Sequence, residues 1–167
     1  MGHCLILGQT ESGKTSLARA LCENYKNQGV ETIVLDPMHD PRWQCSFKTA
    51  EPDLFFQVYN DSTRCAAFFD EAGDLCKDYP TEMIRTATKG RHRGHRNHYI
   101  AQRATLINRT IRDQCTELFL FNSALEDCKI HAAEWNAPDI RDHGPFLAQG
   151  EYFYKQRLGI LQRGKLF

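Results

Sequence analysis

The chain has 167 residues, of which 41% are hydrophobic and 25% charged, and 21 Lys and Arg residues balance 21 Asp and Glu residues. This length fits one domain over residues 1–167, and the composition excludes a disordered chain. The apolar runs are far shorter than the roughly 18 residues that cross a bilayer, and the sequence shows no signal-peptide pattern, so we expect a cytoplasmic protein without a transmembrane segment.

Seven cysteines are present, an odd number, and none forms a Cys-x-x-Cys pair. Most of them lie in apolar runs or on the apolar faces of expected helices. This pattern favours reduced, largely buried thiols over a disulfide framework.

Strand-like and helix-like segments alternate along the chain. Strands are expected at residues 4–7, 32–35, 64–69, 99–102 and 117–121, and helices at 14–28, 52–60, 80–88, 105–114 and 123–135. The first strand is short and apolar and the second is similar, which is typical of strands buried on both faces of a parallel sheet. Residues 151–154 and 158–161 predict a terminal β-hairpin. We therefore expect an α/β fold with a mainly parallel central sheet and a C-terminal hairpin.

The most specific motif spans residues 8–15, which read Gly-Gln-Thr-Glu-Ser-Gly-Lys-Thr. It matches the phosphate-loop (Walker A) pattern and has the required context, after an expected strand and before an expected helix. The backbone N–H groups of such a loop form a nest for phosphate at the helix N-terminus. We expect Lys14 to reach the β- and γ-phosphates of ATP and the Thr15 hydroxyl to bind Mg²⁺. A glycine-rich turn without a ligand is the alternative interpretation.

Residues 8–15 and the next residue supply the expected nucleotide-binding set. Its members are Gly8, Gln9, Thr10, Glu11, Ser12, Gly13, Lys14, Thr15 and Ser16.

Two carboxylates follow the apolar run at residues 66–69, an arrangement that resembles a Walker B motif. The carboxyl ends of parallel strands line the ligand crevice, so Asp70 is expected to hold Mg²⁺. Glu71 is expected to act as the general base on the attacking water, a role that needs a carboxylate near the metal but not on it. The alternative is an ordinary polar loop after a buried strand.

Residues 83–112 contain eight Lys and Arg residues and no Asp or Glu. Three interpretations of this basic window stay open: a nucleic-acid contact surface, an arginine that completes a neighbouring subunit's site, and a solvated loop. Residues 89–98 contain two glycines and predict a mobile loop. Three histidines in it, at positions 92, 95 and 98, suggest zinc only weakly, because the intervening arginines repel a cation.

Gln102 ends the strand expected at residues 99–102. If this strand lies near the strand that ends at Asp70, the Gln102 amide would sit beside the carboxylates, where it could sense the γ-phosphate or orient water. A hydrogen-bonded polar residue at a strand end is the alternative.

Taken together, four features resemble the FtsK/HerA superfamily of DNA-pumping ATPases. They are the phosphate loop, the Phe-Asp-Glu strand end, the Gly-Arg-His-Arg-Gly-His segment and the run Ile-Ala-Gln-Arg at residues 100–103. Within it, the small size is similar to the genome-packaging ATPases of membrane-containing, tectivirus-like viruses. The resemblance implies a RecA-like core that works as a ring, a hexamer, and pumps double-stranded DNA into a capsid. It also implies that Gln102 is a sensor and that one arginine serves the neighbouring site.

The candidates for that arginine, or for DNA contact, are Arg85, Arg91, Arg93, Arg96 and Arg103. The resemblance further implies capsid or membrane-vertex proteins as partners and a location in the host cytoplasm or on the virion.

Other functions fit parts of this pattern. A P-loop kinase of a nucleoside or small metabolite would use the basic segment as a lid. A morphogenesis ATPase of filamentous-phage type has a similar loop and third strand, although that group usually carries a membrane span. A nucleotide-gated switch would bind without turnover, but the sequence has no guanine-reading Asn-Lys-x-Asp or Thr-Lys-x-Asp segment after the fifth strand.

Overall fold

An eight-stranded sheet forms the centre of the computed structural model, which describes residues 2–167, and its strand order is β3-β2-β4-β5-β1-β6-β7-β8. The strands are β1 (His3–Leu7), β2 (Thr32–Leu35), β3 (Phe47–Thr49), β4 (Ala66–Phe69), β5 (Arg96–Ala101), β6 (Cys115–Phe121), β7 (Glu151–Gln156) and β8 (Gln162–Lys165). Neighbours from β3 to β6 pair in parallel, whereas β7 and β8 pair antiparallel. The expected α/β fold with a C-terminal hairpin is confirmed.

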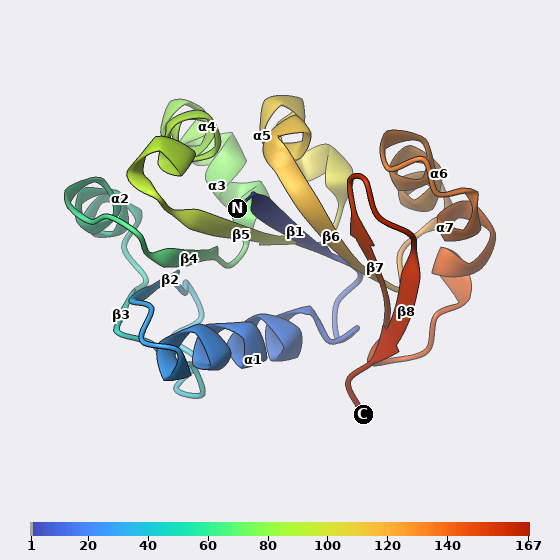
Figure 1. The fold of residues 1–167 in the computed structure, drawn as a ribbon, viewed down its shortest axis with the longest axis horizontal. Coiled ribbons are helices and arrows are strands. Elements are labelled where there is room, and N and C mark those ends of the chain that lie inside the picture. Colours follow the sequence, from blue (N-terminus) through green and yellow to red (C-terminus); the bar gives the residue numbers. More distant parts are fainter. Residues whose placement is uncertain (1) are drawn as a thin grey trace.

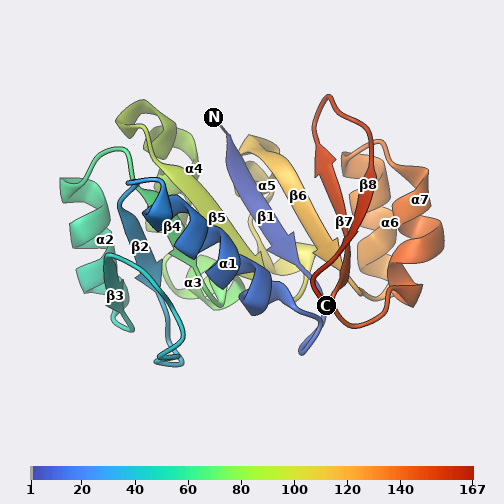
Figure 2. The same cartoon turned by 60° about the horizontal axis from the view of Figure 1, so that its bottom comes forward.

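Helices cover both faces of this sheet. They are α1 (Lys14–Asn27), α2 (Pro52–Asp61), α3 (Ala72–Asp78), α4 (Pro80–Lys89), α5 (Arg109–Gln114), α6 (Leu125–Glu134) and α7 (Pro138–His143). Figure 1 shows α1 on one face and α2 to α7 over the other. Figure 2 shows that α6 and α7 lie beside the antiparallel end formed by β7 and β8.

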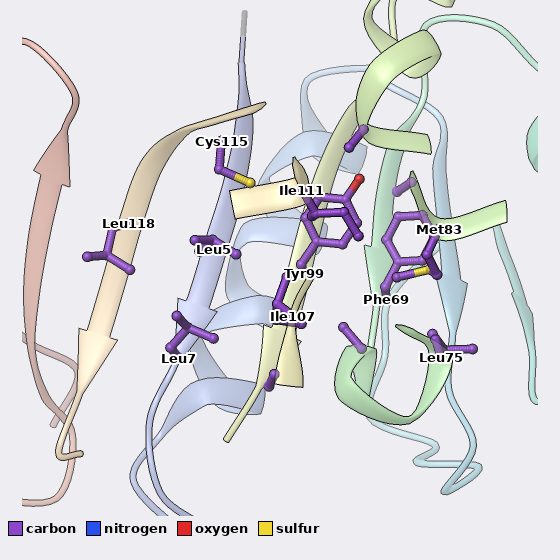
Figure 3. Packing of buried hydrophobic residues seen from close by; sticks show 14 of the residues in the cluster. Leu5, Leu7, Phe69, Leu75, Met83, Tyr99, Ile107, Ile111, Cys115 and Leu118 are labelled. Carbon is purple, nitrogen blue, oxygen red and sulfur yellow. The ribbon is translucent and has the colours of Figure 1, made fainter. Parts of the chain in front are cut away.

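The alternation of side chains along β1 divides the core into two layers. Leu5 and Leu7 join a large cluster on the side of α2 to α7, part of which Figure 3 shows, whereas Cys4 and Ile6 join a smaller cluster under α1. All four are at most 1% exposed. Burying one Leu or Ile side chain stabilises a fold by about 1.5–3 kcal/mol. This two-sided burial explains why the strand is apolar throughout.

The largest differences from the expected elements lie in the second hairpin strand. It was expected at residues 158–161, but β8 is Gln162–Lys165 and residues 157–159 form the turn. Leu158 and Ile160 are 103% and 78% exposed. The apolar pattern was misleading because β8 is an edge strand whose polar residues face water on both sides. Sequence reasoning also did not predict β3, α3 and α7, which have three, seven and six residues.

The expectation of a mobile loop at residues 89–98 is wrong. Residues 90–93 form a 3₁₀ turn, and β5 begins at Arg96, three residues before the expected strand. Pairing of β5 with β1 on one side and β4 on the other buries its first residues. Side-chain polarity at Asn97 and His98 hid this strand start in the sequence.

All seven cysteines are free; five are buried, and Cys45 and Cys76 are half-buried, as expected. In the described part of the chain, no helix has the length and apolar character needed to span a bilayer.

Candidate functional site

The phosphate loop, residues 8–15, joins β1 to α1 at the carboxyl edge of the sheet. Gly8 and Gly13 have φ values of +152° and +119°, and a Cβ on Gly8 would lie 2.7 Å from the Phe121 Cβ. Only glycine fits these positions without strain. Lys14 is the first residue of α1, and its Nζ donates to the Gln9 carbonyl at 2.7 Å. The lysine therefore crosses the loop, with its ammonium group at the centre of the turn.

Asp70 and Glu71 follow β4 at the same edge. Asp70 is 7% exposed and its Oδ1 accepts the Glu71 N–H at 3.0 Å, whereas Glu71 is exposed and has a φ of +53°. Burial raises the pKa of Asp70 to about 6, and the nearby charges of Glu71 and Asp36 add to the effect. Burial also lowers the pKa of the Lys14 ammonium. The two carboxylates thus differ in environment, as a metal ligand and a general base require.

Gln102 lies between the phosphate loop and the carboxylates. Strand β5 ends one residue before Gln102 and pairs with β1 on one side and with β4 on the other, so Gln102 follows a direct neighbour of both strands. The Gln102 Nε2 donates to the Thr10 Oγ1 at 3.0 Å. The sequence analysis expected Gln102 near the carboxylates if its strand lay near the strand that ends at Asp70, and these two strands are direct neighbours.

A recess of about 120 Å³ unites these groups. Its lining includes Thr10, Glu11, Lys14, Thr15, Asp70, Glu71 and Gln102. The oxygens of Asp70 and Thr15 are hard donors, the kind that Mg²⁺ prefers, and each leaves positions for water and phosphate oxygens. The residues present therefore fit the expected Mg²⁺.

A larger cleft of about 890 Å³ extends along the phosphate loop and includes residues that sequence reasoning missed. One group is the loop after β2, residues 37–42. Asp36 organises it by accepting the N–H groups of Met38 and Asp40 at 3.1 and 2.5 Å. Asp40 in turn pairs with Arg19 of α1 at 2.7 Å. Asp36 ends a buried strand as Asp70 does, and that signal could have pointed to this loop.

The second missed group is Gln149 and Phe167, which line the same cleft from the β7 and β8 side. The Gln149 Nε2 donates to the Glu11 carbonyl at 3.0 Å, and the Gly150 N–H donates to the Ser12 carbonyl at 2.9 Å. These contacts join positions about 138 residues apart in the chain. Nothing in the local sequence indicates them.

The arginine candidates fall into two groups. Arg96 begins β5 and pairs with Glu117 at 2.7 Å, while Arg91 and Arg93 in the adjoining turn donate to main-chain carbonyl groups. Arg96 lies six positions before Gln102, which corresponds to about 20 Å of strand. These three arginines therefore lie at the end of β5 away from the phosphate loop.

Arg103, by contrast, directly follows Gln102 and lines a cleft of about 530 Å³ that also includes Gln9, Thr10 and Gln102. It pairs with the buried Asp127 of α6 at 3.2 Å, and its side chain is 55% exposed. Of the five candidates, the structure brings Arg103 to the edge of the site.

The basic window is less charged than its sequence indicates. Acidic partners from other segments pair with Arg96, Arg103 and Arg112, and Asp113 pairs with Arg109. His95 and His98 are buried: His95 accepts the Cys65 N–H at 3.2 Å, and His98 stacks on Phe68 with ring centroids 4.2 Å apart. Burial lowers the pKa of His98 to about 3. These two histidines are core residues.

A groove between α2 and α4 is lined by basic side chains that form no ion pair within residues 2–167. It has a volume of about 390 Å³, and we call it the basic groove. It is lined by Phe56, Tyr59, Asn60, Glu82, Arg85, Thr86, Lys89, Gly90 and Arg93. Three cations and one carboxylate converge there, so the groove favours an anionic ligand.

The comparisons with known proteins agree with this geometry. The family model of the central domain of the helicase HerA matches residues 2–40. No curated protein sequence matches the chain. Its fold resembles the genome-packaging NTPase B204 of Sulfolobus turreted icosahedral virus 2, solved with AMPPCP, with a TM-score of 0.81 and 12% identity over 99% of this chain and 98% of that one.

Two larger proteins have a similar fold. The pCW3 conjugation coupling protein TcpA, solved with ATPγS, has a TM-score of 0.72 and 15% identity over 98% of this chain and 59% of its own. The cytoplasmic domain of the type VII secretion ATPase EccC of Thermomonospora curvata has a TM-score of 0.70 and 14% identity over 98% and 25%. The expected resemblance to FtsK/HerA ATPases is confirmed.

Proposed function

We propose that this protein is a Mg²⁺-dependent ATPase that moves double-stranded DNA and serves as a viral genome-packaging motor. The observation that carries the ATPase part is the recess in which Lys14, Asp70, Glu71 and Gln102 meet at one sheet edge. The DNA part is supported by B204, a genome-packaging NTPase with the same fold over nearly the whole length of both chains.

Each residue has a distinct part in the proposed hydrolysis. The loop N–H groups and Lys14 hold the β- and γ-phosphates. Thr15 and Asp70 would hold Mg²⁺, which when bound would supply positive charge against the charge that develops on the phosphates. Glu71 is exposed at the edge of the recess, where it accepts a proton from the attacking water. Gln102 donates to a phosphate oxygen or to the water from the strand between the two motifs.

DNA translocation requires a ring in which each site is completed by its neighbour. We propose a homo-oligomeric ring, a hexamer, with capsid or membrane-vertex proteins as further partners and the host cytoplasm or virion as its location. Arg103 is the candidate for the arginine that acts between subunits, because it combines exposure with a place at the site's edge. The basic groove is the candidate for contact with the DNA backbone.

The test is ATP hydrolysis by the purified protein at low salt, with and without long double-stranded DNA. We expect turnover that rises with DNA, no turnover for Lys14→Ala, and retained ATP binding without turnover for Glu71→Gln. Glu23→Gln, an exposed change on α1, is the matched control and should behave as wild type. Wild-type turnover by Glu71→Gln would exclude Glu71 as the base. Turnover that ignores DNA and needs a small acceptor would instead support a kinase.

A further inference from the structure

The two ends of the large cleft differ in chemistry. The phosphate loop lies at the end of β1, near the middle of the sheet. On one side of it, β5, β4 and β2 bring Gln102, Asp70 and the loop after Asp36. On the other side lie β6, β7 and β8 (Figure 2). The γ-phosphate would be cleaved beside Asp70 and Glu71, so the rest of the nucleotide would extend away from these carboxylates. Gln149 and Phe167 line the cleft on the far side of the phosphate loop.

An exposed aromatic ring lies on that other side. Phe167 is 65% exposed although it lines the cleft, and its ring packs over Gly150: a Cβ at Gly150 would lie 2.9 Å from the ring. Gly150 has a φ of +82°, and its lack of a side chain lets the Phe167 ring approach the main chain closely. One side of the ring is thus supported by the protein, and much of the rest is exposed.

Hydrogen bonds anchor the chain next to Phe167 to the phosphate loop. The Leu166 N–H donates to the Gly150 carbonyl at 2.9 Å, and the Gly150 N–H donates to the Ser12 carbonyl at 2.9 Å. Gln149, the neighbour of Gly150, donates to the Glu11 carbonyl at 3.0 Å. The main chain next to Phe167 is therefore anchored beside the loop that would bind the phosphates.

We propose that Phe167, supported by Gly150, is the stacking surface for the nucleobase of the nucleoside triphosphate. The proposal rests on the proposed nucleotide site and adds the residue that recognises the base. Every nucleobase has a flat aromatic face, and stacking on a protein aromatic ring is favourable for each of them. The ring alone thus favours a nucleotide over inorganic phosphates without selecting one base.

The test compares two probes, Mg·ATP and Mg·tripolyphosphate, which share phosphates but differ in the nucleoside. Binding is measured by calorimetry or by competition with a fluorescent nucleotide. We expect Phe167→Ala to weaken ATP binding by about tenfold and to leave tripolyphosphate binding within about twofold of wild type. Phe167→Trp should retain ATP binding, because it keeps an aromatic face.

Phe146→Ala is the matched control, since Phe146 is 81% exposed and does not line the cleft. Unchanged ATP binding by Phe167→Ala would overturn the proposal. So would tighter ATP binding, which would mean that the ring obstructs the cleft, or an equal loss for both probes, which would mean that Phe167 acts through the phosphate loop. Lys14→Ala should weaken both probes. If it weakens neither, the proposed phosphate site fails separately from the stacking surface.

Discussion

The Gln102 Nε2 and the Thr10 Oγ1 lie 3.0 Å apart, in a hydrogen bond that joins the end of β5 to the phosphate loop across 92 positions of sequence. Both side chains are exposed and both line the recess that holds Lys14 and the two carboxylates. Motion of Gln102 toward a bound phosphate would require this bond to break. The glutamine and the loop threonine are therefore coupled partners.

Gln102→Ala is expected to lower kcat by about 10²-fold with a small effect on ATP binding, because a donor to the transition state is lost while the phosphate loop is unchanged. Steady-state kinetics and direct ATP binding separate the two effects. Thr10→Val removes the partner but keeps the shape, and it should leave kcat within a few-fold of wild type. If Gln102→Ala hydrolyses ATP at the wild-type rate, the amide has no catalytic part.

Asp70→Asn is expected to stabilise the nucleotide-free protein at pH 8. The pKa of Asp70 in the fold is about 6 against an ordinary 3.8, because burial disfavours the carboxylate. The ionised Asp70 side chain therefore destabilises the fold fully above about pH 6, and this destabilisation disappears as the pH falls toward 3.8. It corresponds to at most about 3 kcal/mol. Urea unfolding in EDTA at pH 8 and at pH 4.5 measures it.

In the same titration, Asp74→Asn, an exposed change in the first turn of α3, is the control and should have little effect at either pH. Equal or lower stability of Asp70→Asn at pH 8 would contradict the expected penalty. Metal-dependent ATPase activity should be lost in Asp70→Asn.

His131→Leu is expected to reduce the acid sensitivity of the fold. His131 is 1% exposed, neither ring nitrogen has a hydrogen-bond partner, and burial lowers its pKa to about 4. Between about pH 6.5 and pH 4, His131 is protonated in the unfolded chain but mostly neutral in the folded chain. The free energy of unfolding therefore decreases as the pH is lowered through this range. At pH 5 this loss is about 2 kcal/mol.

Chemical denaturation at pH 7.5 and pH 5 checks this. The leucine variant should be at least as stable as wild type at pH 7.5, since no hydrogen bond is lost, and clearly more stable at pH 5. The exposed change His92→Leu should show no such dependence. An equal pH dependence of His131→Leu and wild type would show that another group controls the acid response.

Replacing the three cations of the basic groove, Arg85, Lys89 and Arg93, with Gln is expected to lower the salt dependence of DNA binding. Each lost phosphate contact removes about 0.9 from the slope of log K against log salt, so the slope should fall by about two to three. A charge-matched variant with Lys26, Lys129 and Arg141 changed to Gln should retain the wild-type slope. The same slope in both variants would exclude the groove as the DNA contact.

Local chemistry determined the parts of this protein that the sequence could predict. A buried parallel strand is apolar on both faces, so the five parallel strands that were expected appear as short apolar runs, with β5 beginning earlier than expected. The phosphate loop is a contiguous motif whose geometry depends on Gly8 and Gly13. The acids after β4 and the free, mostly buried cysteines follow in the same way from neighbouring residues.

Only the tertiary structure decided which distant residues meet. Insertion of β5 between β1 and β4 brings Gln102 to Thr10, and no local pattern specifies that strand order. Acidic side chains from other elements pair with some of the basic residues at 83–112. Counting the charges along that segment alone therefore overestimates the positive potential at the protein surface. Phe167 reaches the cleft because β7 and β8 return the chain to the phosphate loop. The hydrogen bonds that hold it there join main-chain groups, and because every residue type except proline carries both groups, the sequence does not indicate them.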